Sequence, residues 1–186
     1  TQDMKNEMKG RLYNFDKLSK LPIARENQYK TINFTKNDFN KLGFNDDFHL
    51  STFTKIISKK TGKYEFKIDS DDGSRLKIYN LENKVWYNVI DNDGLHPSKT
   101  IVGSLKLINN QNYIIHIYYF NAGGESSLNV YIKEPNESDF NFLEGGEVVD
   151  DSLLKTITMP HLNRPVGAIL YQNSPSQSGW EARITE

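Results

Sequence analysis

Cysteine is absent from the 186 residues of this chain. Its absence excludes disulfide bonds, thiolate metal ligands and a cysteine nucleophile. It does not fix the cellular compartment, because an extracellular bacterial protein can lack cysteine entirely. Any reactive or metal-binding group must therefore come from other side chains or from the backbone.

Long apolar runs and an excess of basic residues are also missing. No stretch of about 18 apolar residues occurs, so we expect no segment that inserts into a membrane. The formal net charge is −1, and the 23 lysine and arginine residues are spread along the chain. A nucleic-acid-binding protein usually carries a basic face, so we expect no nucleic-acid partner.

Sequence signatures of catalysis are lacking as well. The chain contains no Gly-x-Ser-x-Gly element and no phosphate-binding loop, and its four histidines do not show metal-ligand spacing. Acidic residues are plentiful, but nothing in the sequence holds two of them at the separation that glycoside hydrolysis requires. We therefore expect a non-catalytic protein, not an enzyme.

Short strands separated by turn signals dominate the middle of the chain. Residues 63–69 alternate between apolar and charged side chains, which predicts a half-buried strand. Residues 113–120 are apolar on both faces, which predicts a central strand of a sheet. Further strands are expected at 76–79, 85–90, 105–107 and 128–132, with one short helix near 38–42. Such spacing is typical of an all-β sandwich or barrel.

The two ends of the chain are less regular. The first forty residues mix aromatic and polar side chains, which suggests irregular structure wrapped around a sheet. Residues 135–151 are polar and contain glycine, which indicates a connector or a surface loop. Strand-like character resumes in residues 152–186. A segment this short rarely forms an independent core, so we expect it to add strands to the same fold.

Two adjacent aspartates, Asp71 and Asp72, lie between a predicted strand and Gly73. Neighbouring side chains of a regular strand point to opposite faces, so a shared ligand requires the backbone to leave strand geometry there. A cis peptide bond would allow this, and calcium takes six to eight oxygen ligands. Two interpretations stay open at this point: a calcium site, or an ordinary acidic turn.

Two further loops are rich in oxygen atoms. Residues 120–126 (FNAGGES) offer the Asn121 amide and two glycines that free the backbone to turn its carbonyls inward, although a flexible hairpin loop explains them too. Residues 91–96 (DNDGLH) contain Asp91 and Asp93, which could bind a metal ion. The NDG sequence is also a strong turn signal, which favours a turn with Asp93 capping backbone amides.

Four separated pieces of the sequence resemble one known family. In chain order they are GKYEF, SDDGSRL, DNDGLH and YFNAGG. They are similar to the protective-antigen-type β-sandwich domain of bacterial toxins and adhesins, glycoside hydrolases and yeast flocculins. The resemblance covers about residues 8–134. We therefore expect an antiparallel lectin β-sandwich at 1–134, a connector at 135–151, and a C-terminal β extension at 152–186 that packs on the sandwich.

The resemblance also implies a set of metal ligands. In the adhesin branch of the family, adjacent aspartates joined by a cis peptide bond hold a calcium ion, and they correspond to Asp71 and Asp72. A loop before the last long strand supplies an asparagine side chain, here Asn121, and two backbone carbonyls, here those of Gly123 and Glu125. Some flocculins have an aromatic residue where this chain has Glu125, which argues against a sugar-stacking contact there.

Sugar binding would use the exposed side of this Ca2+ ion, where vicinal hydroxyls replace two waters. The expected carbohydrate contacts are Asp71, Asp72, Asn121, Gly124, Glu125, Asp93 and His96. The resulting hypothesis is a calcium-dependent carbohydrate-binding domain of a bacterial surface adhesin. It would be a monomeric, extracellular part of a larger protein and would bind cell-surface or matrix glycans.

Two alternatives to this hypothesis stay open. The chain could be a non-catalytic glycan-binding accessory domain of a secreted glycoside hydrolase. It could also be a structural or protein-interaction module of a toxin or surface protein, in which calcium provides only rigidity. The sequence does not identify the sugar or the flanking domains.

Overall fold

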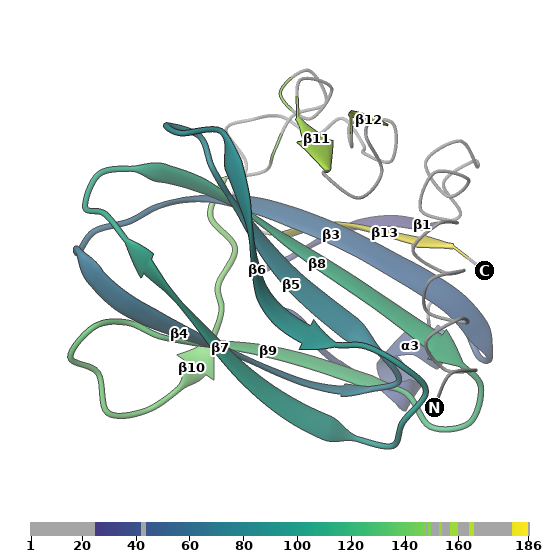
Figure 1. Ribbon diagram of the computed structural model, residues 1–186. Helices are drawn as coiled ribbons and strands as arrows, with labels where there is room; N and C mark the ends of the chain where they lie inside the picture. Colours follow the sequence, from purple (N-terminus) through teal and green to yellow (C-terminus); the bar gives the residue numbers. More distant parts are fainter. Residues whose placement is uncertain are drawn as a thin grey trace.

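The computed structural model describes residues 25–41, 44–147, 149, 153, 157–159, 164–165 and 180–185. Two antiparallel sheets face each other across an apolar core, as Figure 1 shows. This arrangement confirms the predicted β-sandwich. The first part of the region that resembles the family, residues 8–24, lies outside the described residues, and so do residues 166–171 of the C-terminal extension. Within the described part, no helix is long and apolar enough to span a bilayer.

The six-stranded sheet contains the central strand that the sequence predicts. Its order is β1 (Arg25–Tyr29), β13 (Trp180–Thr185), β3 (Asp47–Ile57), β8 (Asn112–Ala122), β5 (Ser74–Asn80) and β6 (Val85–Asn92). β8 is buried on both faces over nearly its whole length. β13 pairs with both β1 and β3, so the C-terminal extension adds a strand to the sandwich, as expected. β1 is a regular strand, which corrects the expectation of irregular structure there.

The five-stranded sheet contains the predicted half-buried strand. Its order is β10 (Asn141–Phe142), β9 (Ser127–Lys133), β4 (Gly62–Asp71) and β7 (Lys99–Leu107), and β2 (Asn33–Thr35) also pairs with β9. Buried and half-buried residues alternate along β4, as its sequence predicts. A separate pair consists of β11 (Thr158–Met159) and β12 (Arg164–Pro165). The domain boundaries at residues 134 and 151 stay predictions.

Apolar side chains form one cluster between the two sheets and a second on the outer face of the six-stranded sheet. Successive residues of a strand point to opposite faces, so β8 contributes to both clusters. Ile115 and Ile117 lie in the first cluster, whereas Ile114 and Phe120 lie in the second. Each fully buried side chain of this size contributes roughly 1.5–3 kcal/mol, so β8 holds both layers together.

The short helix α3 (Lys36–Lys41) closes one end of the first cluster. Its first turn is capped by Thr35 and Asp38: the Thr35 N–H donates to Asp38 Oδ2 at 2.8 Å, and the Asp38 N–H donates to Thr35 Oγ1 at 3.3 Å. Phe39 is fully buried and stacks on Tyr119 of β8, with 5.6 Å between the ring centroids. The helix therefore packs beneath the end of β8 that leads to the Asn121 loop.

Candidate metal centre

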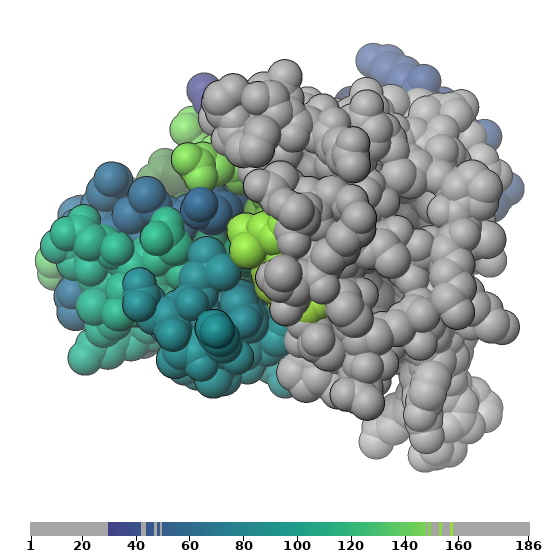
Figure 2. Space-filling model, turned by 90° about the horizontal axis from the view of Figure 1, so that it is seen from above, coloured from purple at the N-terminus to yellow at the C-terminus, as the bar shows by residue number. Residues whose placement is uncertain are grey.

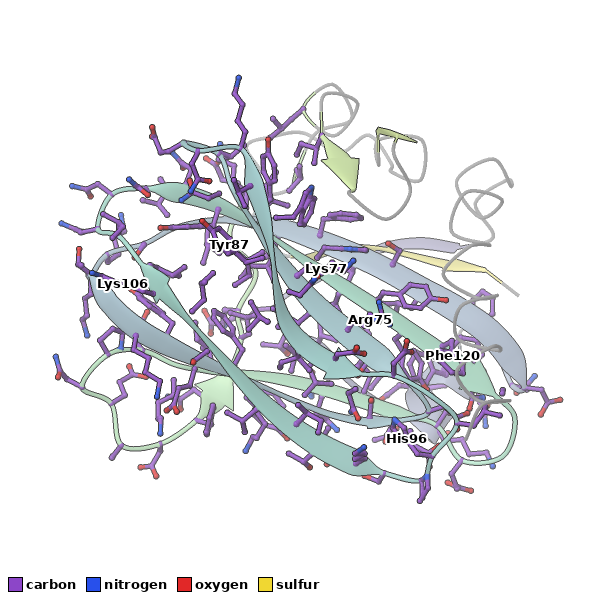
Figure 3. All side chains as sticks on the ribbon, viewed as in Figure 1. Arg75, Lys77, Tyr87, His96, Lys106 and Phe120 are labelled. Atoms are coloured by element: carbon purple, nitrogen blue, oxygen red, sulfur yellow. The ribbon has the colours of Figure 1, made fainter. Side chains whose placement is uncertain are left out.

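The aspartate pair lies where the chain crosses from one sheet to the other. β4 of the five-stranded sheet ends at Asp71, and β5 of the six-stranded sheet begins at Ser74. The peptide bond between Asp71 and Asp72 is cis. Figure 3 labels His96 and Phe120 at this same end of the sandwich. Loops from both sheets thus meet around the two aspartates.

The carboxylate of Asp72 is buried and held by two backbone amides. Its Oδ2 accepts a 2.9 Å hydrogen bond from the N–H of Ala122, and its Oδ1 accepts a 3.3 Å bond from the N–H of His96. The residue is 8% exposed. An ionised carboxylate has about four lone-pair sites. Each oxygen of Asp72 therefore keeps capacity for a further ligand.

Asp71 lies close enough to Asp72 for their charges to interact. Burial raises the pKa of the Asp71 carboxyl, and the negative charge of Asp72 raises it further. Glu125 acts in the same direction, whereas His96 lowers it. Like charges that share a site disfavour ionisation, and a nearby cation favours it. The pair therefore has the electrostatic character of a cation site.

Asn121 presents a buried oxygen to which no described residue donates. Its side chain is fully buried, and its Nδ2 donates a 2.6 Å hydrogen bond to the carbonyl of Asp46. That bond fixes the orientation of the amide. Within the described residues, Asn121 Oδ1 has no hydrogen-bond partner. A buried acceptor without a donor costs about 1–3 kcal/mol, and a metal ion at this oxygen would remove the cost.

The loop after Asn121 is shaped by two glycines. Gly123 has φ +118° and Gly124 has φ +78°, which are conformations that favour glycine. A Cβ added at either position would meet no atom within 4 Å, so the loop borders open space. Glu125 is exposed and forms a 3.1 Å ion pair with Lys36 of α3. Because the Glu125 carboxylate is paired with Lys36, the expected calcium ligand at this position is the backbone carbonyl.

The side chains of Asp93 and His96 form an ion pair and hydrogen bonds with other protein groups. Asp93 Oδ2 pairs with Nη2 of Arg75 at 2.5 Å, and burial raises the pKa of its carboxyl while Arg75 opposes that shift. The ring nitrogens of His96 lie 2.7 Å from the carbonyl of Pro97 and 3.0 Å from that of Asn92. Direct contact between a sugar and either side chain stays a prediction.

Three positioning residues were not expected from the sequence. The hydroxyl of Tyr119 donates to the carbonyl of Asp71 at 2.6 Å, and that of Ser70 donates to the carbonyl of Asp72 at 2.8 Å. Asn92, which is 1% exposed, donates to Ser70 Oγ at 3.1 Å. Tyr119 stands in a run of apolar residues and Ser70 within a strand pattern. Only Asn92 could have been identified as a candidate from the sequence, because it lies among the polar residues of the DNDG turn.

The described residues contain no cluster of three or more His, Cys, Asp or Glu side chains that could hold a metal ion. The expected set has only two such side chains at its centre, Asp71 and Asp72. Its other ligands are the Asn121 amide oxygen and backbone carbonyls. Oxygen atoms of these kinds are the ligands that calcium takes in proteins. The donor chemistry of the residues present therefore fits calcium.

Comparison with solved structures finds similar domains at low identity. A PA14 sugar-binding domain from an RTX adhesin has a TM-score of 0.47 and 18% identity, over 63% of this chain and 72% of that one. A subtype-switched Epithelial Adhesin 9 to 1 A domain from Candida glabrata, in complex with β-lactose, has a TM-score of 0.48 and 16% identity, over 63% of this chain and 66% of that one. A β-glucosidase from Kluyveromyces marxianus has a TM-score of 0.40 and 15% identity, over 48% and 12%.

No protein of curated function matches the sequence. The family model described as the PA14 domain matches residues 7–144. That region contains the aspartate pair, the Asn121 loop and every strand from β1 to β10. Since it spans well over half of the sequence, the chain belongs to the PA14 domain family.

Proposed function

We propose that this chain is a calcium-dependent carbohydrate-binding domain of the adhesin type, exposed at a cell surface or secreted as part of a bacterial protein. Membership of the PA14 family supports carbohydrate binding as the general activity. The observation that carries the calcium site is the fully buried Oδ1 of Asn121, which has no hydrogen-bond partner in the part of the chain that the structure describes and lies one residue from the amide that holds Asp72.

The ion would be held by the carboxylates of Asp71 and Asp72, by Asn121 Oδ1, and by the carbonyls of Gly123 and Glu125. When bound, calcium supplies exchangeable coordination positions for oxygen ligands such as vicinal sugar hydroxyls. The amides of Ala122 and His96 fix the Asp72 carboxylate, and Tyr119 fixes the Asp71 backbone. The open space beside Gly123 and Gly124 leaves room for a sugar at this loop.

A single monosaccharide should bind weakly at such a site, because few protein groups surround the open side of the loop. Multiple copies on a surface raise the effective strength by avidity. The partners would thus be glycans of a cell surface or matrix, and the domain itself would perform no catalysis.

One observation favours a second candidate, in which the calcium is purely structural. Glu125 and His96, two of the expected sugar contacts, are bonded to other parts of the protein. A metal ion that only ties together the β4–β5 crossing and the end of β8 would need no contact from either residue. The chain would then be a structural or interaction module.

A glycan array, probed with calcium and again with EGTA, tests the proposal. We expect glycan binding in calcium, loss in chelator, and recovery when calcium is restored. Binding that survives EGTA would reject the calcium–sugar mechanism. Calorimetric calcium binding without any glycan signal would favour the structural module instead. The Asp139→Asn variant, which changes an exposed loop aspartate elsewhere, should behave as the wild type.

A further inference from the structure

A hollow of about 440 Å³ lies at the end of the sandwich opposite the aspartate pair. It is formed by the β5–β6 turn, the end of β7 and the start of β8, and we call it the distal pocket. Its polar lining includes Glu82, Asn83, Tyr87, Lys106, Gln111 and Tyr113. Its volume falls within the range of about 300–1,000 Å³ found for small-molecule sites.

The distal pocket is well separated from the metal centre. β5 begins at Ser74, beside the aspartates, and ends at Asn80, which lines the distal pocket. Six residue steps along a strand span about 20 Å. Figure 3 shows Tyr87 and Lys106 toward one end of the molecule and His96 toward the other. In Figure 2 the teal β5–β6 turn and the green β7–β8 turn form one end of the coloured surface.

Gln111 lines the pocket, and its amide oxygen is hydrogen-bonded within the protein. Its Oε1 accepts hydrogen bonds from Asn80 Nδ2 at 3.4 Å and from the Tyr113 hydroxyl at 3.3 Å. The Tyr113 hydroxyl in turn accepts a 2.9 Å bond from the N–H of Ile108. These bonds use the amide oxygen and fix which way the amide faces. No described protein group accepts from Gln111 Nε2, so two donors remain.

Two more groups offer hydrogen-bonding capacity. The Tyr87 hydroxyl accepts a 2.9 Å bond from Asn83 Nδ2, which leaves its own hydrogen free to donate. Lys106 forms no ion pair with any described residue, and neither does Glu82. The pocket therefore combines donors with one carboxylate acceptor, and its two charges cancel.

The walls of the pocket are partly apolar. The rings of Tyr87 and Tyr113 line it together with the aliphatic side chains of Leu105 and Ile108, and Ile108 is 37% exposed. A sugar has apolar C–H faces that pack on such surfaces, and hydroxyls that both donate and accept hydrogen bonds. The charges of Lys106 and Glu82 sum to zero, so the pocket has no net charge that would favour an ionic ligand over an uncharged one.

We propose that the distal pocket is a second saccharide-binding site, which takes one uncharged sugar unit without any metal ion. Gln111 Nε2 and the Tyr87 hydroxyl donate to sugar oxygens, Glu82 accepts from a sugar hydroxyl, and the tyrosine rings contact the C–H face. The inference does not depend on the calcium site. If both sites act, one domain can hold two parts of a glycan, or two glycans, and gain avidity.

The test follows the 15N-labelled full chain by NMR in excess EGTA, while methyl glycosides of glucose, galactose, mannose and N-acetylglucosamine are added separately. We expect at least one glycoside to shift the side-chain amide signals of Gln111 and Asn83 and to leave those of Asn121 unchanged. Failure of all four glycosides to shift the pocket signals would overturn the inference. Shifts confined to the Asn121 loop would overturn it as well.

Two variants separate ligand contact from a structural role. Gln111→Glu keeps an oxygen that accepts from Asn80 and Tyr113 but replaces the free donors, and Tyr87→Phe removes one hydroxyl. Each should weaken glycoside binding about fivefold or more, the loss of one or two hydrogen bonds. Asn109→Ala, which alters an exposed amide of the same turn outside the pocket, should bind as the wild type.

Thermal unfolding of each variant checks that the fold is intact. The two substitutions are chemically different, so each variant tests the pocket contacts by itself if the other fails to fold. Wild-type affinity in a folded pocket variant would contradict the proposed contacts, and so would an equal loss in Asn109→Ala. Asp72→Asn should leave this binding unchanged, which separates failure of the distal pocket from failure of the calcium site.

Discussion

The N–H of Ala122 donates a 2.9 Å hydrogen bond to Oδ2 of Asp72. This bond ties the crossing between β4 and β5 to the end of β8, although the two residues are 50 positions apart. It places the Asp72 carboxylate beside the loop that begins with Asn121. The aspartate pair and the Asn121 loop therefore form one unit of structure, on which the first two predictions depend.

Asp72→Asn should weaken calcium binding at least about tenfold, because it removes one negative charge from a site for a hard cation. Isothermal titration calorimetry measures the change directly. The amide oxygen can still accept from the Ala122 N–H, but the amide nitrogen then faces the His96 N–H, so thermal unfolding checks that the fold persists. Unchanged affinity would count against the site, and Asp139→Asn serves as the matched control at an exposed position.

Asn121→Ala should reduce the stabilisation that calcium gives to the folded state. A ligand at 100 times its dissociation constant stabilises by about 2.7 kcal/mol, and the variant loses one ligand oxygen. Chemical unfolding with calcium and with EGTA gives the difference for each protein. The exposed variant Asn88→Ala should keep the full effect. If Asn121→Ala keeps it too, the buried Oδ1 is not a ligand.

Gly73→Ala should lower the free energy of unfolding by about 1–3 kcal/mol, the usual range for an overpacked site. A Cβ at this position would collide with the ring of Phe120 and approach the Gly94 nitrogen to 2.9 Å. Phe120 is fully buried, so its ring has little room to move. Urea unfolding measures the loss, and Ser104→Ala at an exposed site should show none. An unchanged midpoint would mean that both the Phe120 ring and the Gly94 loop shift freely.

Lys77 should make the stability of the protein depend on alkaline pH. Burial, assisted by the positive charge of Arg75, lowers the pKa of Lys77 to about 8, against attraction from Asp91 and Asp93. Between pH 8 and 10.5 the unfolded chain binds more protons at this residue, so its contribution to stability rises with pH. The cost of the charged form is fully present below pH 8.

The Lys77→Met variant isolates that contribution. The free energy of unfolding of the wild type, relative to the variant, should increase by up to about 3 kcal/mol between pH 7 and pH 10.5. Urea unfolding at several pH values measures it, and all other titrating groups cancel in the difference. A difference that is constant over this range would show that Lys77 titrates normally in the folded protein.

Local patterns predicted much of the sandwich correctly. The alternation in residues 63–69 gave the half-buried strand β4, and the doubly apolar run at 113–120 gave the central strand β8. Both predictions succeeded because burial on one or both faces leaves a direct record in neighbouring residues. The strand β1 was missed, since its partner β13 lies more than 150 positions away along the chain.

In the candidate site, too, some residues can be identified from local sequence, whereas others depend on contacts between distant segments. Short motifs singled out Asp71, Asp72 and Asn121 as candidates, because oxygen-bearing residues and glycines cluster around them in the sequence, and the family resemblance made them the expected ligands. The supporting contacts of Tyr119 and Ser70 could not be named, since each joins segments that only folding brings together. The same holds for the bond between Asn92 and Ser70.

By itself the sequence determined which segments form strands, where turns interrupt them, and which oxygen-bearing residues stand next to glycine. These properties depend on the spacing of neighbouring side chains. Only the tertiary structure decided that the ends of β4 and β8 meet, and that the Asn121 oxygen is buried with no donor among the described residues. It also decided that Gln111, whose amide oxygen is already hydrogen-bonded, lines a hollow at the far end. Those features arise from contacts between distant segments, whose geometry is fixed by the packing of the two sheets.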